Sequence, residues 1–246
     1  MTIAAVIFVI LASAVLPIGL AVFACTRRRG YWKALLAGLG CFTFFQLLLR
    51  LPLLQYVLPN FAWFSVVSAT QPILYIFLLS LSAGVFEELG RYIVMRIFLK
   101  KHLSAGDGIS FGIGHGGIEA VSLVGINYIL AFALYGTAAF STASDGLIFS
   151  AGCERIFALA IQIALSVMVM LSIKRKKPLW LLLALVLHTA VDFFSVLATQ
   201  FFSAFDFSPL LVELGLFFVA LLSLWFIFFE CKKEKLQATS DASPKP

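Results

Sequence analysis

Charged residues are scarce in this sequence, and no segment is polar enough to form a soluble domain. Of the 246 residues, 12% are charged and 62% are hydrophobic, and the mean hydropathy is +1.04. These values exclude a soluble domain with an ordinary polar surface. The composition therefore predicts a multi-pass protein of the cell membrane.

Cysteine patterns and a signal-peptide pattern are also missing. The four cysteines (Cys25, Cys41, Cys153 and Cys231) are scattered, with no CxxC and no spacing that supports a disulfide pairing. The first apolar run, "TIAAVIFVILASAVLPIGLAVFAC", has no basic residue before it and has Arg27, Arg28 and Arg29 after it. This order is the reverse of a secretory signal peptide, so we expect the run to remain as a membrane span.

Lysine and arginine are absent from every second break between the apolar runs. A span needs about 20 mainly apolar residues, and on this basis the sequence predicts seven spans, at about 3–25, 32–56, 71–99, 108–135, 147–173, 178–200 and 209–230. The breaks after the second, fourth and sixth spans contain no Lys or Arg. The positive-inside rule then places the N-terminus outside and the C-terminus in the cytoplasm.

The predicted fold is an all-α transmembrane helix bundle. We expect a single domain at residues 1–236, in which the chemistry-bearing core lies at about 70–200, and a short disordered cytoplasmic tail at 237–246. The net charge of +6 is accounted for by the predicted cytoplasmic loops. The sequence contains no internal repeat and no nucleic-acid-binding pattern, so no nucleic acid is expected as a partner. The apolar spans make the lipid bilayer the expected environment.

Against this apolar background, three spans place ionisable side chains at one depth. Counting about 1.5 Å per helical residue from the basic loops gives similar depths for Glu87, Glu88, His115, Glu119, His188 and Asp192. A charge at the centre of a membrane helix costs about 2.5 to 3.5 kcal/mol on insertion scales, so such groups usually face a protein interior or a water-filled cavity. We expect a buried polar site that opens toward the cytoplasm.

The spacing of these residues supports a common centre. The pairs Glu87/Arg91, His115/Glu119 and His188/Asp192 are each four residues apart, so each pair projects from one helix face. Simpler interpretations remain open. Arg91 could only neutralise Glu87, and each His pair could be an ordinary hydrogen-bonded pair.

Other polar and small residues accompany these pairs. In "FGIGHGGIEA", Phe111, Gly112 and Gly116 lie on or beside the face of His115, and small residues let a neighbouring helix approach closely. Gln162 lies at the same depth and could bind substrate or water, or make an interhelical contact. Nearer the predicted outer face, Arg50 and Glu154 are predicted to form a buried ion pair between the second and fifth spans.

This set of groups can support peptide hydrolysis. The reaction needs a base that deprotonates water, donors for the developing oxyanion and an acid for the leaving amine. A buried glutamate suits the base, and His115 and His188 can orient water and donate to an oxyanion. The same groups could instead hold zinc, with His115, His188 and Glu88 as ligands and the metal activating the water. The residues alone do not separate these mechanisms.

Three motifs in this order resemble a known superfamily. "FEELGR", "FGIGH" and "HTAVD" are similar to the paired Glu with a following Arg, the Phe-x-x-x-His and the His-x-x-x-Asn/Asp of the type II CAAX prenyl endopeptidase and abortive-infection superfamily of intramembrane glutamic proteases. The longer context looks most like its YhfC branch, which is related to the scaffold subunit of gamma-secretase. The resemblance covers residues 70–200. In the prenyl-protease pattern three residues separate the second Glu from the Arg, whereas here Leu89 and Gly90 alone intervene.

The resemblance implies a role for each matching residue. Glu87 or Glu88 would activate the water, His115 would position water or substrate, and His188 with Asp192 would support the oxyanion. Apart from the resemblance, the positions of Arg91, Glu119, Phe111 and Gln162 beside these residues lead us to expect that they support them. The expected activity is an intramembrane endopeptidase that cleaves a membrane protein or a lipidated peptide. A non-catalytic scaffold or immunity protein of the same fold is the first alternative, and a proton- or cation-coupled transporter is the second.

Overall fold

The computed structural model describes residues 2–27, 31–100, 103–201 and 208–242. Within these ranges the regular elements are all helical. Seven helices or runs of helices are long and apolar enough to cross a membrane: Ile3–Arg27, Tyr31–Asn60, Pro72–Phe98, Ala105–Phe140, Asp145–Lys174, Leu179–Gln200 and Leu210–Thr239. The predicted helix bundle and its seven spans are therefore confirmed, and the chain is a multi-pass membrane protein.

The helices follow one another through short connections. The α-helices are α1 (Thr2–Ile10), α2 (Leu16–Arg27), α3 (Tyr31–Phe42), α4 (Ala62–Thr70), α5 (Pro72–Phe98), α6 (Ala105–Ala120), α7 (Ile126–Tyr135), α8 (Asp145–Lys174), α9 (Leu179–Phe201) and α10 (Ser208–Ala242). Helix α4 is a short helix in the connection between the second and third spans, for which no helix was expected. Helix α10 continues to Ala242, so residues 237–242 of the predicted tail are helical, and 243–246 lie outside the described residues.

Local sequence explains where the motif-bearing helices begin. Helix α6 starts at a capping box, in which the Ser104 hydroxyl accepts from the Asp107 backbone N–H and the Asp107 carboxylate accepts from the Ser104 backbone N–H. Helix α8 starts after Ser144, whose hydroxyl accepts from the Leu147 backbone N–H at 3.2 Å. Helix α5 has Pro72 in its first turn, where a missing N–H costs nothing.

Several spans contain π-helical turns. The second span changes from α3 into the π-helical segment η2 (Thr43–Arg50), and further π-helical turns occur at Leu11–Val15 and Val121–Gly125. A π-helical turn inserts a residue relative to the α-helical register and re-aims the side chains that follow; such turns are frequent at functional sites. In η2 the buried side chains are the polar residues Gln46 and Arg50.

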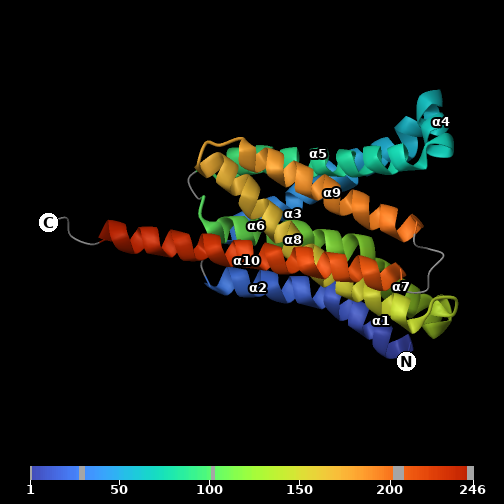
Figure 1. Ribbon diagram of the computed structural model, residues 1–246. Helices are drawn as coiled ribbons and strands as arrows, with labels where there is room; N and C mark the ends of the chain where they lie inside the picture. Colours follow the sequence, from blue (N-terminus) through green and yellow to red (C-terminus); the bar gives the residue numbers. More distant parts are fainter. Residues whose placement is uncertain (1, 28–30, 101–102, 202–207, 243–246) are drawn as a thin grey trace.

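Helix α6 lies between α3 and α8 in the middle of the bundle (Figure 1). A Cβ on Gly114 would lie 2.0 Å from the Leu35 carbonyl oxygen on α3, and a Cβ on Gly112 would lie 2.5 Å from Cα of Ile163 on α8. The predicted close approach at Gly112 and Gly116 is confirmed, and the neighbouring helix is α8. Because side chains at these positions would separate the helices, the glycines determine how near α8 comes to His115.

Helices α5 and α9 run side by side at the top of Figure 1. A Cβ on Gly84 would lie 2.5 Å from the Thr189 hydroxyl and 3.1 Å from the Leu185 carbonyl oxygen. This close approach places His188, next to Thr189, against the acidic face of α5. The three motifs, separated by up to a hundred residues in the sequence, are thereby brought to one layer.

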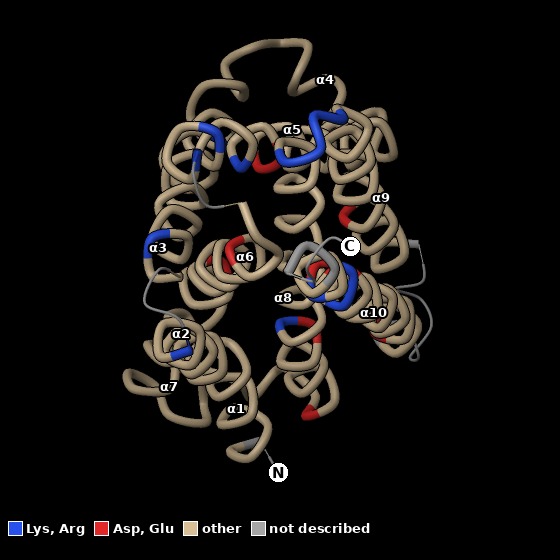
Figure 2. Tube along the Cα trace, turned by 90° about the vertical axis from the view of Figure 1, so that its left-hand side faces the viewer, with Lys and Arg blue, Asp and Glu red and all other residues tan. Residues whose placement is uncertain are grey.

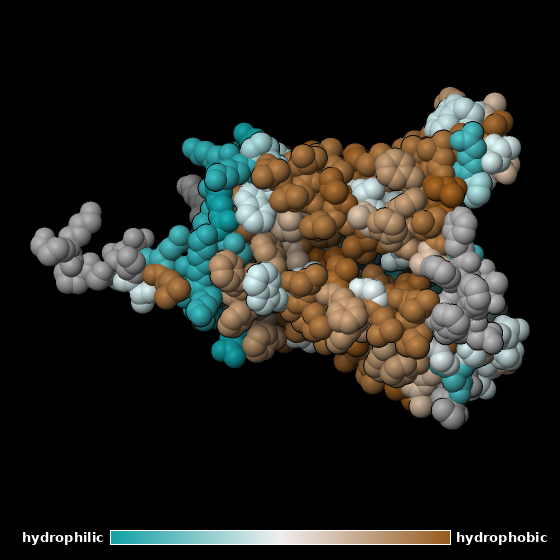
Figure 3. Space-filling view, viewed as in Figure 1, coloured by the Kyte–Doolittle hydropathy of each residue, from teal (hydrophilic) through white to brown (hydrophobic). Residues whose placement is uncertain are grey.

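Basic residues gather at one end of the bundle, which faces the viewer in Figure 2. Figure 3 shows an apolar band between this hydrophilic end and the opposite one. Ion pairs close the basic end: Lys174 pairs with Glu234, and Arg175 Nη2 lies 2.5 Å from Glu230 Oε2. Glu234 also accepts from the Ala105 backbone N–H at 2.7 Å. These contacts fix the ends of α6, α8 and α10 relative to one another.

Candidate active site

One carboxylate oxygen of Glu87 receives contacts from three helices. Glu87 Oε2 lies 2.9 Å from His115 Nε2 on α6, 3.3 Å from Arg91 Nη2 on α5 and 3.4 Å from Gln162 Nε2 on α8. The residue is only 3% exposed. This charge at membrane depth is therefore stabilised by a cation and by hydrogen-bond donors, as a buried carboxylate requires.

Glu88 has a different environment, because neighbouring helical residues point about 100° apart. Its Oε1 accepts from Arg91 Nη1 at 2.9 Å and lies 2.6 Å from His188 Nδ1. Glu88 is 0% exposed, and its Oε2 has no hydrogen-bond partner in the described part of the chain. Arg91, three residues after one glutamate and four after the other, thus contacts both carboxylates.

His188 connects the two glutamates. While its Nδ1 contacts Glu88, its Nε2 lies 4.0 Å from Glu87 Oε2 and 3.6 Å from Asp192 Oδ2. A carboxylate on one ring nitrogen fixes the orientation of the ring and leaves the other nitrogen for chemistry. His188 Nε2 and the two flanking carboxylates thus face the same space.

His115 lies behind Glu87. It is fully buried, its ring makes an edge contact with Phe42 at a centroid distance of 5.2 Å, and it stacks with Phe111 at 6.3 Å. Its Nδ1 has no hydrogen-bond partner among the described residues. Because the aromatic rings hold the imidazole in place, its polar contact is directed at Glu87.

A polar cavity of about 410 Å³ adjoins this cluster. Its lining includes Glu87, Glu119, Gln162, His188 and Asp192, whereas Glu88, Arg91 and His115 are not part of it. Of the two adjacent glutamates, only Glu87 therefore reaches the cavity.

The cavity extends in the opposite direction from the one expected. Its lining residues on α5 run from Leu79 to Glu87, and those on α9 run from His188 to Val196. Both stretches lead away from the basic end of the bundle. Contrary to the prediction that the site opens toward the basic, predicted cytoplasmic end, the described lining of the polar cavity does not extend toward that end.

Gln162 links the Glu87 cluster to a second acidic group. Its Nε2 donates to Glu119 Oε2 at 2.6 Å, and its Oε1 accepts from Arg91. Glu119 in turn lies 3.5 Å from Arg155 Nη1. The structure therefore brings together all the sequence-predicted site residues, with Phe111, Arg91 and Gln162 as their immediate supports.

The expected ion pair between Arg50 and Glu154 is wrong. Arg50 Nε donates to Ser82 Oγ at 2.9 Å and Nη2 donates to the Leu79 carbonyl oxygen at 2.8 Å. Glu154 instead pairs with its neighbour Arg155. The π-helical turns of η2 direct Arg50 toward α5 rather than α8. Ser82 and Gln46 were not predicted, since single uncharged side chains in a span carry little information.

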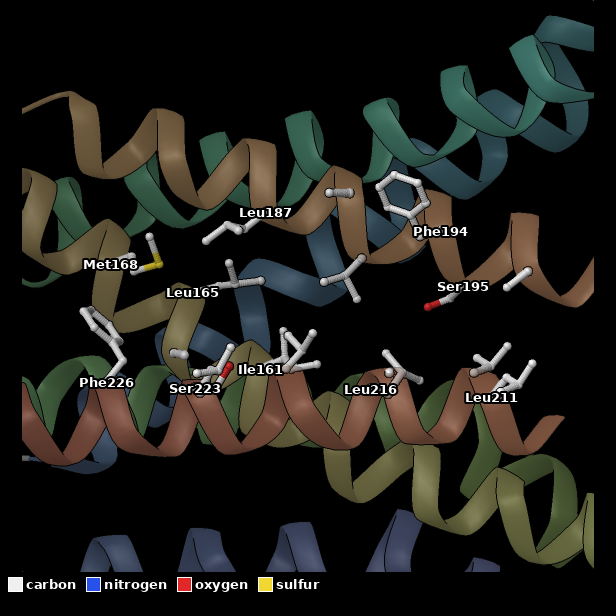
Figure 4. A pocket seen from close by; sticks show the side chains of 18 of the residues that line it. Ile161, Leu165, Met168, Leu187, Phe194, Ser195, Leu211, Leu216, Ser223 and Phe226 are labelled. Carbon is white, nitrogen blue, oxygen red and sulfur yellow. The ribbon is translucent and has the colours of Figure 1, made fainter. Parts of the chain in front are cut away.

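An apolar groove of about 660 Å³ lies beside the polar cavity, between α8, α9 and α10. Figure 4 shows Leu187 and Phe194 of α9 opposite Leu216 and Phe226 of α10. Ile161, Leu165, Val191, Ser195 and Leu216 line both spaces. The groove and the cavity are therefore contiguous.

The donor atoms fit the chemistry of a metal site, although they do not form a ligand shell. Imidazole nitrogen and carboxylate oxygen are the ligands that zinc accepts. His115 Nε2 and His188 Nε2 lie 2.9 Å and 4.0 Å from the same oxygen, Glu87 Oε2. Glu88 contacts the opposite nitrogen of His188, so it would orient that ligand rather than bind the metal. No group of three or more such residues is already arranged around a metal position in the described ranges.

Comparisons with known proteins agree with these features. The model of a family described as "YhfC intramembrane metalloprotease" matches residues 12–148 and 137–206. The chain is 33% identical over 220 residues to a protein of Bacillus subtilis (strain 168) named "Uncharacterized membrane protein YhfC", and the match covers 78% of this chain and 84% of that protein. No solved structure matches significantly.

Proposed function

The chain belongs to the YhfC intramembrane metalloprotease family, and from this membership and the site geometry we propose that it is an intramembrane endopeptidase with Glu87 as the catalytic carboxylate. One observation carries the assignment. Glu87 is the member of the glutamate pair that lines the polar cavity, and its carboxylate contacts the buried His115. A base must reach both the substrate space and a group that orients it, and Glu87 does both.

In the proposed reaction, Glu87 takes a proton from a water molecule in the cavity while the water oxygen attacks the carbonyl carbon of a peptide bond. His115, held by its aromatic neighbours, keeps the Glu87 carboxylate in position. The tetrahedral intermediate then collapses: the C–N bond breaks, and the proton held by Glu87 passes to the leaving amine. The products are a new carboxylate and a new amine.

His188 is proposed to stabilise the negative oxygen of the intermediate. Glu88 accepts from its Nδ1, so an imidazolium at this position would donate from Nε2 toward the cavity. Asp192 lies beside the same nitrogen and balances its charge. Arg91 contacts both Glu87 and Glu88 without reaching the cavity, which makes it a positioning residue.

A metal is compatible with the same residues. His188, Glu87 and either His115 or Asp192 would hold it, and when bound it would polarise the substrate carbonyl and lower the energy needed to deprotonate water. In that arrangement Glu88 would keep its contact with His188 Nδ1, as carboxylates do for metal-binding histidines.

The substrate class follows from the surroundings of the cavity. The cavity lies at membrane depth and shares lining residues with an apolar groove. A membrane-embedded or lipidated peptide can place its apolar part in the groove or the bilayer and its peptide bond at Glu87. A scaffold of the same fold would have no need for a cavity at this carboxylate.

The test is cleavage of an apolar peptide library by purified protein in lipid nanodiscs. Wild type should release products detected by mass spectrometry, and Glu87→Gln should lose this activity at unchanged melting temperature. Glu213→Gln, which removes a carboxylate near the start of the last span and outside both the cavity and the groove, is the control. Equal cleavage by wild type and Glu87→Gln would refute the proposal.

A further inference from the structure

Among the described residues, the buried cation Arg50 lines the polar cavity and forms no salt bridge. We propose that Arg50 binds a carboxylate of the peptide substrate and so determines where the peptide is cut. The inference rests on the proposed peptidase function and extends it to substrate selection.

The contacts of Arg50 leave part of its guanidinium free. Nε donates to Ser82 Oγ and Nη2 donates to the Leu79 carbonyl oxygen, both neutral acceptors. In the described part of the chain, no hydrogen bond involves Nη1 and no salt bridge involves Arg50. The residue is 8% exposed and lines the polar cavity. Its remaining surface therefore faces the space that the substrate would occupy.

The other cations of the site are paired. Arg155 contacts both Glu119 and Glu154, Arg91 contacts both adjacent glutamates, and His188 contacts Glu88. Among the described residues, Arg50 is thus the one positively charged lining residue of this cavity without a carboxylate partner. Glu87 and Asp192 line the same cavity and act on Arg50 electrostatically, but neither forms a salt bridge with it. A buried charge at membrane depth without a direct partner is costly, and a ligand carboxylate would supply that partner.

The chemistry of the guanidinium selects a carboxylate. Its planar fork of N–H donors matches the two oxygens of a carboxylate or phosphate group. Arg50 lies ten residues before Asn60, the last residue of its apolar run, and is thus separated from the end of that run by up to about 15 Å of helical rise. This separation favours a carboxylate carried by a peptide over a lipid phosphate.

The position of Arg50 defines how far the bound carboxylate would lie from the peptide bond that is cut. It is anchored to α5 at Leu79 and Ser82, which precede Glu87 by eight and five residues. These offsets correspond to about 8 to 12 Å along a helix. An extended peptide advances about 3.3 to 3.6 Å per residue, so the bound carboxylate would lie about two to four residues from the peptide bond at Glu87.

Two sources could supply this carboxylate: a free C-terminus or an Asp or Glu side chain. The experiment uses apolar peptide libraries in nanodiscs in matched forms: a C-terminal acid, a C-terminal amide, and amides that carry an internal Asp or an internal Asn. Cleavage by wild type should favour one of the carboxylate forms over its neutral counterpart by about 10- to 100-fold in kcat/KM. Cuts should cluster about two to four residues from the carboxylate.

In Arg50→Gln, the ratio of kcat/KM for the carboxylate form to kcat/KM for its neutral counterpart should fall to near one. Arg96→Gln, an exposed arginine at the other end of α5, is the matched control and should keep the wild-type preference. Cleavage that depends on Glu87 but shows no carboxylate preference, or a preference that survives in Arg50→Gln, would overturn the inference and leave the peptidase proposal intact.

A binding measurement separates the two proposals if no cleavage occurs. Fluorescence anisotropy with labelled acid, amide, Asp and Asn peptides should show tighter binding of the acid or Asp form to wild type than to Arg50→Gln. That result without turnover would support the carboxylate site and refute the peptidase. Equal binding of all forms, or Arg50-dependent binding of phosphate-bearing lipid instead of peptide, would refute the carboxylate site.

Discussion

Glu87 and Glu88 are adjacent in the sequence but belong to different environments. Glu87 lines the polar cavity and contacts His115, whereas Glu88 is enclosed between Arg91 and His188. The helical rotation of about 100° between neighbours is the physical origin of this division. It assigns one glutamate to the substrate and the other to the support of an imidazole.

The two glutamates should therefore respond differently to substitution. Glu87→Gln should lower kcat by about 10² to 10⁴, the usual contribution of a general base. Glu88→Gln should lower activity by about 10- to 100-fold through loss of control over His188, as for other supporting carboxylates. Cleavage kinetics on the same peptide library measure both, and the reverse order of effects would contradict the assignment.

His115 should act through its hydrogen bond to Glu87. His115→Gln keeps a donor in the buried space between the aromatic rings, while His115→Leu removes it and leaves Glu87 Oε2 with fewer donors. We expect His115→Gln to retain more activity than His115→Leu, with the difference in kcat rather than KM. Similar activity of both variants, at equal protein level, would indicate that the ring only fills space.

A single methyl group added to Gly112, at the contact between α6 and α8, should lower the stability of the protein. Gly112→Ala would put Cβ 2.5 Å from Ile163 Cα, and overpacking of this kind costs about 1 to 3 kcal/mol. Gly40→Ala is the matched control, because no atom of the described residues lies within 4 Å of its added Cβ. Thermal unfolding in nanodiscs should show a lower midpoint for Gly112→Ala alone; equal midpoints would show that the helices can separate without cost.

Metal content offers a readout that does not depend on turnover. Metal that binds at the site should be lost in His188→Ala, which removes the nitrogen facing Glu87 and Asp192. It should be retained in Glu213→Gln, outside the cavity. Elemental analysis of purified variants measures this. Metal that persists at one equivalent in His188→Ala would place it elsewhere on the chain.

Much of the architecture could be predicted from the sequence because it depends on hydropathy and helical rise alone. The spans and the common depth of the ionisable residues follow from counting along each run. The rotation of each helix does not, and it decides that Glu87 rather than Glu88 reaches the cavity. Arg50 was misassigned for the same reason, since the π-helical turns before it change its direction. The direction of the cavity depends on side-chain packing across α8, α9 and α10, which no single segment encodes.

The central claim is that Glu87 uses water to hydrolyse a peptide bond at membrane depth. The most direct measurement is mass spectrometry of apolar peptides incubated in ¹⁸O-labelled water with nanodisc-reconstituted wild type, Glu87→Gln and Glu213→Gln. The account predicts cleaved products with ¹⁸O in the new C-terminal carboxylate for wild type and Glu213→Gln, and none above background for Glu87→Gln. Labelled products at the wild-type rate from Glu87→Gln would contradict it.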